Sequence, residues 1–507
     1  MAPPKTPGVF IQEVTSFPNS IVEVETAVPA FIGYTEIAAD GARSLHRTPF
    51  RLSSLTEYEA HFGGAPETQF EFGPMPDDWS AQTAFVLQEP GTSGLDAGTG
   101  SHVAHARYYL YYALRLFFTN GGGPCYIVSV GSYDDAITKD DLQAALNLLT
   151  EQPDATMVVI ADAMSLSRQD AEAIQRATLS HCADLASCVA ILDVFAGSSG
   201  LSENDPIGNF RSRIGLVGLD YGAAYYPWLA TFIVAFEDIT IAFLTANARA
   251  TLLDRLNDFV AQRPDAPTLK NFLKDLGLAP ASQPAAPALR QAAHHALLAI
   301  VPFYQSLMLA LQSAVNLLPP SGAIAGVYAR TDFTRGVFKA PAGVDISSVV
   351  KPAVALSDAD VQDLKLPLDG KAVNAIRAFP GQGVLVWGAR TLNGNSEDTR
   401  YVSVRRTLIM FEQSIKQALQ SFALEPNTPA TWISVASEID NFLINQWKVG
   451  ALFGATSLQA FSVTVRLGTS MSHDDVANGV LKVIVSVALV RPAEFISLSF
   501  EQMVQPP

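Results

Sequence analysis

The chain has 507 residues, of which 49% are hydrophobic and 16% are charged, and its formal net charge at pH 7 is −16. This composition is typical of a well-packed globular protein and excludes bulk disorder, and the length predicts roughly three domains. The acidic balance argues against nucleic acid as the main partner, because phosphate backbones attract basic surfaces. Three cysteines make no disulfide framework and favour a reducing compartment.

The acidic excess is unevenly distributed along the chain. From residue 376 to residue 507, ten Lys and Arg balance ten Asp and Glu, so the excess lies upstream. This favours a neutral, contact-making part joined to an acidic, solvated part, with chance composition as the alternative. Residues 1–8 lack the pattern of a secretory signal, and no apolar stretch is long and uninterrupted enough to span a bilayer. We therefore expect no membrane insertion.

The first part of the chain is predicted to form an extended arm, a buried strand and a lobe that consists mainly of loops. Residues 1–26 are interpreted as an N-terminal arm whose β-forming residues are Val9, Phe10, Ile11 and Val14. Residues 27–40 begin the core with a buried strand. Residues 41–105 are interpreted as an inserted outer lobe around a helix at 54–62, which Gly63 and Gly64 end.

Strands and helices then alternate through a middle domain at residues 106–345. Apolar runs predict strands at 125–130, 155–160, 188–195 and 221–229, and helical spacing predicts helices at 108–118, 139–150 and 167–186. Such alternation indicates a parallel sheet covered on both faces. A helical insertion is expected at about 231–313. Its Gly and Pro content predicts a loop with short extended pieces at 318–342.

The last quarter predicts an α+β domain. After an exposed connector at 346–371, the domain spans 372–490, with a strand at 383–388 and an amphipathic helix at 401–422. Thr428 and Pro429 have the pattern of a helix start, and Gly450 ends that helix. A strand follows at 461–467.

The end of the chain alternates with period two, which indicates a strand. Arg491 and Pro492 interrupt it, and a C-terminal arm follows at 491–507. Unpaired terminal strands suggest arms that add to a sheet in this subunit or in a neighbour. The residues expected to receive arms are Leu481, Val483, Val485, Val487 and Leu489, and those of the C-terminal arm are Phe495, Ile496, Leu498 and Phe500.

No constellation of catalytic or metal-ligating residues stands out. The glycines at 121–123 precede a strand, whereas a dinucleotide-binding loop follows one. Cys182 and Cys188 have no second pair to complete a zinc site, and adjacent residues such as His181 and Cys182 face apart on a helix. We expect no enzymatic activity, no cofactor and no metal.

Segments spread along nearly the whole chain carry a resemblance to one family. They are "PGVFI" at 7–11, "TAVPAFIGYTE" at 26–36, "FFTNGGGPCYIVSV" at 117–130, "YYPW" at 225–228, "PPSGAIAGVYARTD" at 319–332, "RGVFKAPAG" at 335–343, "FPGQGVLVWGARTL" at 379–392, "YVSVRRTL" at 401–408, "GALFGAT" at 450–456 and "RPAEFISLSFEQ" at 491–502. Together and in this order, they resemble the tail sheath proteins of contractile phage tails and contractile injection systems, such as phage-like extracellular injection particles and R-type pyocins.

The resemblance implies a multidomain α/β plus α+β sheath subunit with extended N- and C-terminal strand arms. Such a subunit polymerises into hexameric rings of a six-start helix around an inner tube, and contraction drives the tube through a target envelope. The arms add strands to sheets of neighbouring subunits, and the C-terminal domain faces the tube. Further expected partners are the baseplate and the tail terminator. Whether a sister sheath chain also assembles with this one is left open. Assembly is expected in the bacterial cytoplasm, before release of the phage tail or extracellular particle.

Basic residues on the C-terminal helices motivate a hypothesis for the contact with the tube. The residues are Arg405, Arg406, Lys416 and Lys448. Two alternatives to a contractile sheath remain from the sequence: a non-contractile shell or baseplate component of the same type of particle, and an α/β enzyme whose site the sequence does not reveal.

Overall fold

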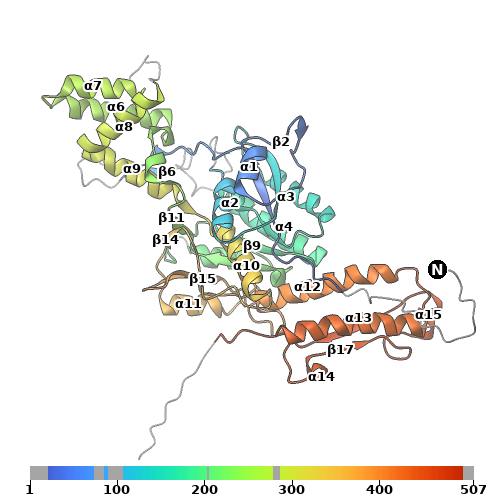
Figure 1. Cartoon of the computed structure of the whole chain (residues 1–507). Coiled ribbons are helices and arrows are strands. Elements are labelled where there is room, and N and C mark those ends of the chain that lie inside the picture. Colours follow the sequence, from blue (N-terminus) through green and yellow to red (C-terminus); the bar gives the residue numbers. More distant parts are fainter. Residues whose placement is uncertain (1–20, 74–84, 89–106, 203–204, 278–285, 495–507) are drawn as a thin grey trace, which may run out of the picture. The chain divides into compact units, whose positions relative to one another are not determined.

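The computed structural model describes residues 21–73, 85–88, 107–202, 205–277 and 286–494 (Figure 1). The chain divides into two compact units. The sheet unit comprises Glu25–Arg406 with the segment from Pro492 onward, and the hairpin unit comprises Thr407–Arg491 with the segment that ends at Val24. The predicted arm residues lie outside the described residues; they are Val9, Phe10, Ile11, Val14, Phe495, Ile496, Leu498 and Phe500.

A mixed sheet, nine-stranded within the described residues, forms the centre of the sheet unit. Its six central strands are parallel, and antiparallel strands complete both edges. In spatial order they are β13 (Val344–Asp345), β16 (Gly383–Val386), β15 (Asn374–Phe379), β10 (Gly222–Tyr226), β9 (Val189–Asp193), β8 (Met157–Val159), β1 (Pro29–Thr35), β7 (Cys125–Ser132) and β4 (Phe50–Leu52). The strands predicted at 27–40, 125–130, 155–160, 188–195, 221–229 and 383–388 are therefore confirmed, and the fold is mixed α/β.

Burial explains why the central strands are almost continuously apolar. Strands β1, β8, β9 and β10 are buried at every residue, so both faces of the sheet are covered. Two pairs of helices pack against these strands. The pairs are α2 (Leu110–Thr119) with α10 (Ser321–Arg335), and α3 (Lys139–Leu148) with α4 (Arg168–Leu185).

Side-chain caps define where several helices begin. Ser54, Thr138 and Ser167 each accept a hydrogen bond from the backbone N–H three residues on, at the starts of α1 (Leu55–Phe62), α3 and α4. Each cap satisfies a backbone donor that has no partner within its helix. The helix starts predicted near residues 54 and 167 are confirmed by this geometry.

The prediction of a loop at residues 318–342 is wrong, because α10 occupies most of that stretch. Its glycines allow close packing of two helices rather than a turn. A Cβ on Gly322 would lie 2.3 Å from the Ala113 carbonyl oxygen, and a Cβ on Gly326 would lie 2.4 Å from that of Phe117. Both oxygens belong to α2. Glycine content alone cannot separate a turn from a helix contact of this kind.

Two buried carboxylates hold the starts of α2 and α10. Asp162 accepts hydrogen bonds from the backbone N–H groups of Tyr109 and Leu110, and also from that of Tyr34 in β1 (2.8 Å). Asp193, at the end of β9, accepts from the Ser321 N–H (2.8 Å) and hydroxyl (2.5 Å). Burial raises the pKa of Asp162 to about 6 and that of Asp193 to about 7, although these hydrogen bonds act in the opposite direction.

The stretch at about 231–313 is mostly helical, as predicted, and contains four α-helices within its described residues. Figure 1 shows its four helices gathered together in yellow and green. They are α6 (Ala246–Ala261), α7 (Ala266–Asp275), α8 (Pro287–Ile300) and α9 (Pro302–Val315). Within the described residues, no single helix is long and apolar enough to cross a membrane. Helices α8 and α9 meet that test of length and composition only as a pair, bent by 111°.

Short elements complete the sheet unit. The stretch expected as a connector holds β14 and α11, and β14 pairs with β11 in a second sheet. The remaining elements are β2 (Ala39–Asp40), β3 (Arg43–Ser44), β5 (Glu71–Phe72), β6 (Leu87–Gln88), α5 (Pro206–Arg213), β11 (Leu229–Thr231), β12 (Leu317–Leu318), β14 (Val349–Pro352) and α11 (Asp358–Lys365).

Two long helices and a small sheet form the hairpin unit. Figure 1 shows α12 (Val402–Leu419, which begins in the sheet unit) beside α13 (Pro429–Lys448), and the Phe411 and Phe442 rings meet edge to face, 5.7 Å apart. The predicted start at Thr428 and Pro429 is confirmed. The other elements are α14 (Ser457–Ala460), β17 (Phe461–Thr464), α15 (His473–Ala477) and β18 (Ile484–Val487).

Because α2 and α10 are in close contact, adding a single methyl group at a glycine between them should destabilise the folded chain. Gly326→Ala should lower the free energy of unfolding by about 1–3 kcal/mol, because the new Cβ meets a backbone oxygen that cannot move aside. Urea unfolding of the soluble chain measures the change. Gly123→Ala is the matched control, since a Cβ there meets no atom within 4 Å. Equal stability of the two variants would contradict the packing role.

Buried Asp193 predicts that stability falls with rising pH. Between the ordinary pKa of 3.8 and about 7, the folded chain holds this proton while the unfolded chain releases it. The free energy of unfolding therefore decreases as pH rises through that window, by up to ~4 kcal/mol at ~1.4 kcal/mol per unit. Asp193→Asn should flatten this slope in urea unfolding measured from pH 4.5 to 8.

The control for this slope is Asp140→Asn, because the Asp140 side chain is 92% exposed. That variant should keep the wild-type dependence on pH. A slope that is unchanged by Asp193→Asn would show that the Asp193 proton is not retained on folding.

Candidate assembly surfaces

A short antiparallel ribbon with open edges is the first candidate surface. Strands β17 and β18 pair from Phe461 with Val487 to Thr464 with Ile484. Within the described residues this sheet has two strands, and a single bridge between Leu452 and Leu489 extends one end. No other described strand pairs with its outer edges, so backbone N–H and C=O groups there can pair with an added strand.

The predicted alternation of side chains appears in the burial pattern of β18 and its flanks. From residue 481 to residue 487, half-buried and exposed residues alternate. All five residues expected to receive arms are half-buried: Leu481, Val483, Val485, Val487 and Leu489. The first four alternate with exposed Lys482, Ile484 and Ser486. This alternation gives the ribbon one face against the hairpin unit and one face open to solvent.

Strand β18 is shorter than the alternation alone indicates. Before it, the Val480 N–H donates to the Asp475 carbonyl oxygen (2.7 Å), and the Lys482 ammonium pairs with the Asp475 carboxylate (2.6 Å). These contacts hold the approach to β18 against α15. The ladder with β17 therefore begins at Ile484.

The four basic residues expected to contact the tube differ in their exposure to solvent. Lys416 and Lys448 are exposed, in the last turns of α12 and α13. Arg405 and Arg406 are buried, and their guanidinium groups pair with carboxylates of the sheet unit. Arg405 binds Asp220, and its guanidinium carbon lies 4.4 Å from the Tyr221 ring centroid. Two of the four cations are thus engaged within the chain.

Arg406 is the centre of a buried group that we call the Arg406 cluster, which consists of Thr26, Asp332 and Arg406. Its two terminal nitrogens donate to the two Asp332 oxygens, at 2.9 and 2.6 Å, and one of them also donates to the Thr26 carbonyl oxygen (2.8 Å). The Thr26 hydroxyl donates to the same carboxylate (2.6 Å). This bidentate pair joins the start of α12, the end of α10 and the segment before β1.

A second group, the Arg390 cluster, consists of buried Arg390 with half-buried Lys365, Tyr401 and Glu494. The Arg390 guanidinium donates to Glu494 from two nitrogens, at 2.5 to 3.1 Å, and its third nitrogen donates to the Gly394 carbonyl oxygen (3.0 Å). The Tyr401 hydroxyl donates to the Glu494 carboxylate (3.1 Å), and the Lys365 ammonium lies 3.7 Å from the same carboxylate. Burial is the largest single influence and opposes ionisation of Glu494. The hydrogen bonds and charge of Arg390, the charge of Lys365 and the Tyr401 hydroxyl together outweigh burial and lower the pKa of Glu494.

The sequence did not predict either cluster, because a single sequence does not reveal which distant residues pair in the fold. Arg390 and Glu494 are 104 positions apart, and Arg406 and Asp332 are 74 apart. A signal was nevertheless present. All four residues lie inside the short segments that carry the family resemblance, where charged residues stand between apolar ones.

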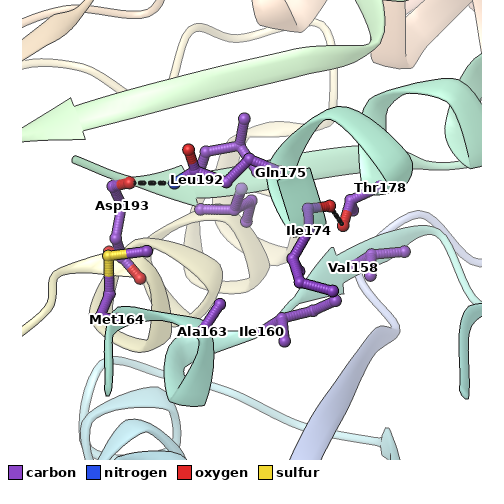
Figure 2. Close-up of a pocket in the computed structure, with 10 residues that line it drawn as sticks. Val158, Ile160, Ala163, Met164, Ile174, Gln175, Thr178, Leu192 and Asp193 are labelled. Atoms are coloured by element: carbon purple, nitrogen blue, oxygen red, sulfur yellow. Dashed lines mark hydrogen bonds between the residues drawn. The ribbon is translucent and has the colours of Figure 1, made fainter. Parts of the chain in front are cut away.

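The small space beside Asp193 does not have the form of a catalytic pocket. Figure 2 shows it between α4, which contributes Ile174, Gln175 and Thr178, and residues at the ends of β8 and β9. Its free space of about 10 Å³ holds no more than one water molecule. The Gln175 side-chain amide donates to the Asp193 carbonyl oxygen. Among the described residues, no group of His, Cys, Asp and Glu could hold a metal ion.

Comparison with known proteins gives a match at the C-terminal end of the chain. The phage tail sheath C-terminal domain family matches residues 395–503. The tail sheath protein of Vibrio phage KVP40 (isolate Vibrio parahaemolyticus/Japan/Matsuzaki/1991) is 30% identical over 139 residues. That alignment covers 27% of this chain and 20% of the phage protein.

Solved structures match the whole chain. A chain of the anti-feeding prophage helical sheath in its contracted state is 26% identical at a TM-score of 0.59, covering 98% of this chain and 99% of that one. A chain from the baseplate of the same particle is also 26% identical, at a TM-score of 0.57, covering 99% of this chain and 100% of that one. The contracted sheath complex of the extracellular contractile injection system PVC has the same fold, at 24% identity and a TM-score of 0.59, covering 99% of each chain.

The match at the C-terminal end concerns sheath proteins, and the end-to-end structural matches concern the same type of particle. These relatives are proteins of tail sheaths and of sheath and baseplate assemblies. The chain thus matches the phage tail sheath C-terminal domain family over residues 395–503, and over 98–99% of its length it is similar to chains of contractile sheaths.

Proposed function

We propose that the chain is the structural subunit of a contractile sheath, which polymerises helically around an inner tube and contracts to drive that tube through a target envelope. The observation that carries this proposal is the likeness to the contracted anti-feeding prophage sheath, which extends over 98% of the chain. Such a match leaves little of the molecule for a different activity. In the proposal the particle assembles in the bacterial cytoplasm and is then released.

The open β17–β18 ribbon supports a mechanism of polymerisation by strand addition. An isolated pair of strands is marginal in water, whereas added strands satisfy the free backbone groups of its edges. In the proposal, the arms at residues 1–26 and 491–507 of neighbouring subunits complete the ribbon. The domain at 372–490 then faces the tube, while the lobe at 41–105 and the domain at 106–345 face outward, and 346–371 connects them.

Contraction in this proposal uses interfacial burial rather than a bound fuel. The extended sheath is metastable, and contraction buries additional surface between subunits. At ~25 cal/mol per Å², about 100 Å² of apolar surface per subunit contributes only ~2.5 kcal/mol. Because the subunits of a cylinder move together, the sum over many subunits is large enough to drive the tube forward.

We retain the tube contact for Lys416 and Lys448, the two candidate cations that are exposed. Further proposed partners are the baseplate and the tail terminator. Whether a sister sheath chain assembles with this one is an open question. The relatives come from sheath and baseplate complexes, which supports self-assembly within a tail-like particle.

Deletion of either arm should block polymerisation without unfolding the chain. Chains that lack residues 1–14 or residues 495–507 should stay soluble with wild-type circular dichroism, because the described core remains. Negative-stain microscopy should then show no cylinders. Deletion of residues 1–4, which precede the β-forming stretch, is the control and should polymerise. Normal cylinders from both arm deletions would contradict strand addition.

Charge reversal at the two exposed lysines should weaken binding to the tube. Lys416→Glu with Lys448→Glu is expected to reduce co-sedimentation with polymerised tube protein at least tenfold, most clearly at low salt. Lys270→Glu with Lys274→Glu makes the same change of charge on exposed residues of α7. Equal co-sedimentation of the two double variants would remove Lys416 and Lys448 from the tube contact.

A further inference from the structure

The chain passes between the two units at three points, and each point lies close to a buried arginine. The crossings are at 24/25, 406/407 and 491/492. Arg406 is the last residue of the sheet unit before the second crossing, and it binds the Thr26 carbonyl oxygen beside the first. Glu494 follows the third crossing by three residues and binds Arg390.

The Arg406 cluster joins two crossings to one rigid helix. Asp332 accepts from Arg406 and from Thr26, so one carboxylate holds both the start of α12 and the segment that leads toward the N-terminus. Asp332 lies on α10, whose first turns are buried against α2 through Gly322 and Gly326. The Arg406 guanidinium carbon also lies 4.8 Å from the Tyr328 ring centroid on the same helix. A pull on either segment therefore reaches α10 through these part-buried hydrogen bonds.

The Arg390 cluster joins the third crossing to the central sheet. The Arg390 N–H donates to the Asn374 side-chain oxygen (2.7 Å), and the Asn374 amide donates to the Arg390 carbonyl oxygen (2.8 Å). Asn374 begins β15 and also donates to the Ala224 carbonyl oxygen in β10. A continuous path of hydrogen bonds thus runs from Glu494 to the parallel strands. Arg390 and Glu494 are both nearly buried, with side chains 3% and 11% exposed.

We propose that the Arg406 and Arg390 clusters are the mechanical anchors of the sheath subunit: within the sheet unit, they hold the chain segments that lead to both arms and to the hairpin unit while the polymer contracts. The proposal rests on the proposed sheath function. Buried bidentate pairs suit this role, because breaking one leaves an unpaired buried charge, whereas an exposed ion pair exchanges with water at little cost. The anchoring residues are positioning residues, since they act through the segments that they hold.

The alternative is that both clusters serve only the stability of the sheet unit. Asp332→Asn and Glu494→Gln remove one charge from each cluster and keep the size of the side chain. Asp363→Asn removes the carboxylate partner of buried Arg211 (2.9 Å), which contacts none of the crossings. Asp162→Asn disturbs a buried carboxylate in the core. The two control variants therefore measure what a lost charge pair and a weakened core do by themselves.

The experiment is triggered contraction of particles assembled with each full-length variant, observed by electron microscopy. The fraction of sheaths that reach the contracted length unbroken should fall at least tenfold for Asp332→Asn and Glu494→Gln, and less than twofold for both controls. Equal fractions for the cluster variants and the controls would overturn the proposal. Failure of the wild-type chain to contract at all would instead refute the proposed function.

Local exchange of backbone amides gives a second readout that simple stability would not move. In Tyr401→Phe and Thr26→Val, which remove one hydroxyl hydrogen bond from each cluster, amides near residues 488–494 and 24–28 respectively should exchange at least fivefold faster. Amides of β8 and β9 should be unchanged. These milder variants replace the charge variants if the latter do not fold, and uniform acceleration across the sheet unit would contradict anchoring.

Discussion

An unsatisfied strand edge is the constraint on which this account of the molecule depends. The β17–β18 ribbon has too few strands to be stable as a separate sheet, and it packs with one half-buried face on the hairpin unit. In the proposed function, strands of other subunits pair with its outer edges. Polymerisation would then complete the sheet of the C-terminal region.

The sheet unit supplies the rigidity that such an assembly requires. Its strands are buried on both faces, and α2 and α10 approach each other at a distance that only glycine permits. Asp162 and Asp193 fix the starts of these two helices from inside the core, at the cost of raised pKa values. Because α10 also carries Asp332, this closely packed helix pair is connected to Thr26 and Arg406, which lie beside two of the crossings between the units.

Much of the fold could be predicted from the sequence, since local signals dominate there. The apolar runs of the parallel strands and the caps at Ser54 and Ser167 are visible without a structure. Helix α10 was not predicted, because Gly322 and Gly326 serve a contact with α2 rather than a turn. Among the candidate site residues, the alternation around Val485 appears in the structure, but the burial of Arg405 and Arg406 does not follow from their basic character. Their partners lie far away in the chain, and no local pattern reveals such pairs.

The most direct test of the central claim is electron microscopy of the purified wild-type chain, alone and together with its tube protein. We expect hollow, striated cylinders in both cases. They should be short and wide for the chain alone, as in a contracted sheath, and longer and narrower on tubes. A monodisperse globular particle under both conditions would contradict a polymerising sheath and would reopen the question of what the parallel sheet does.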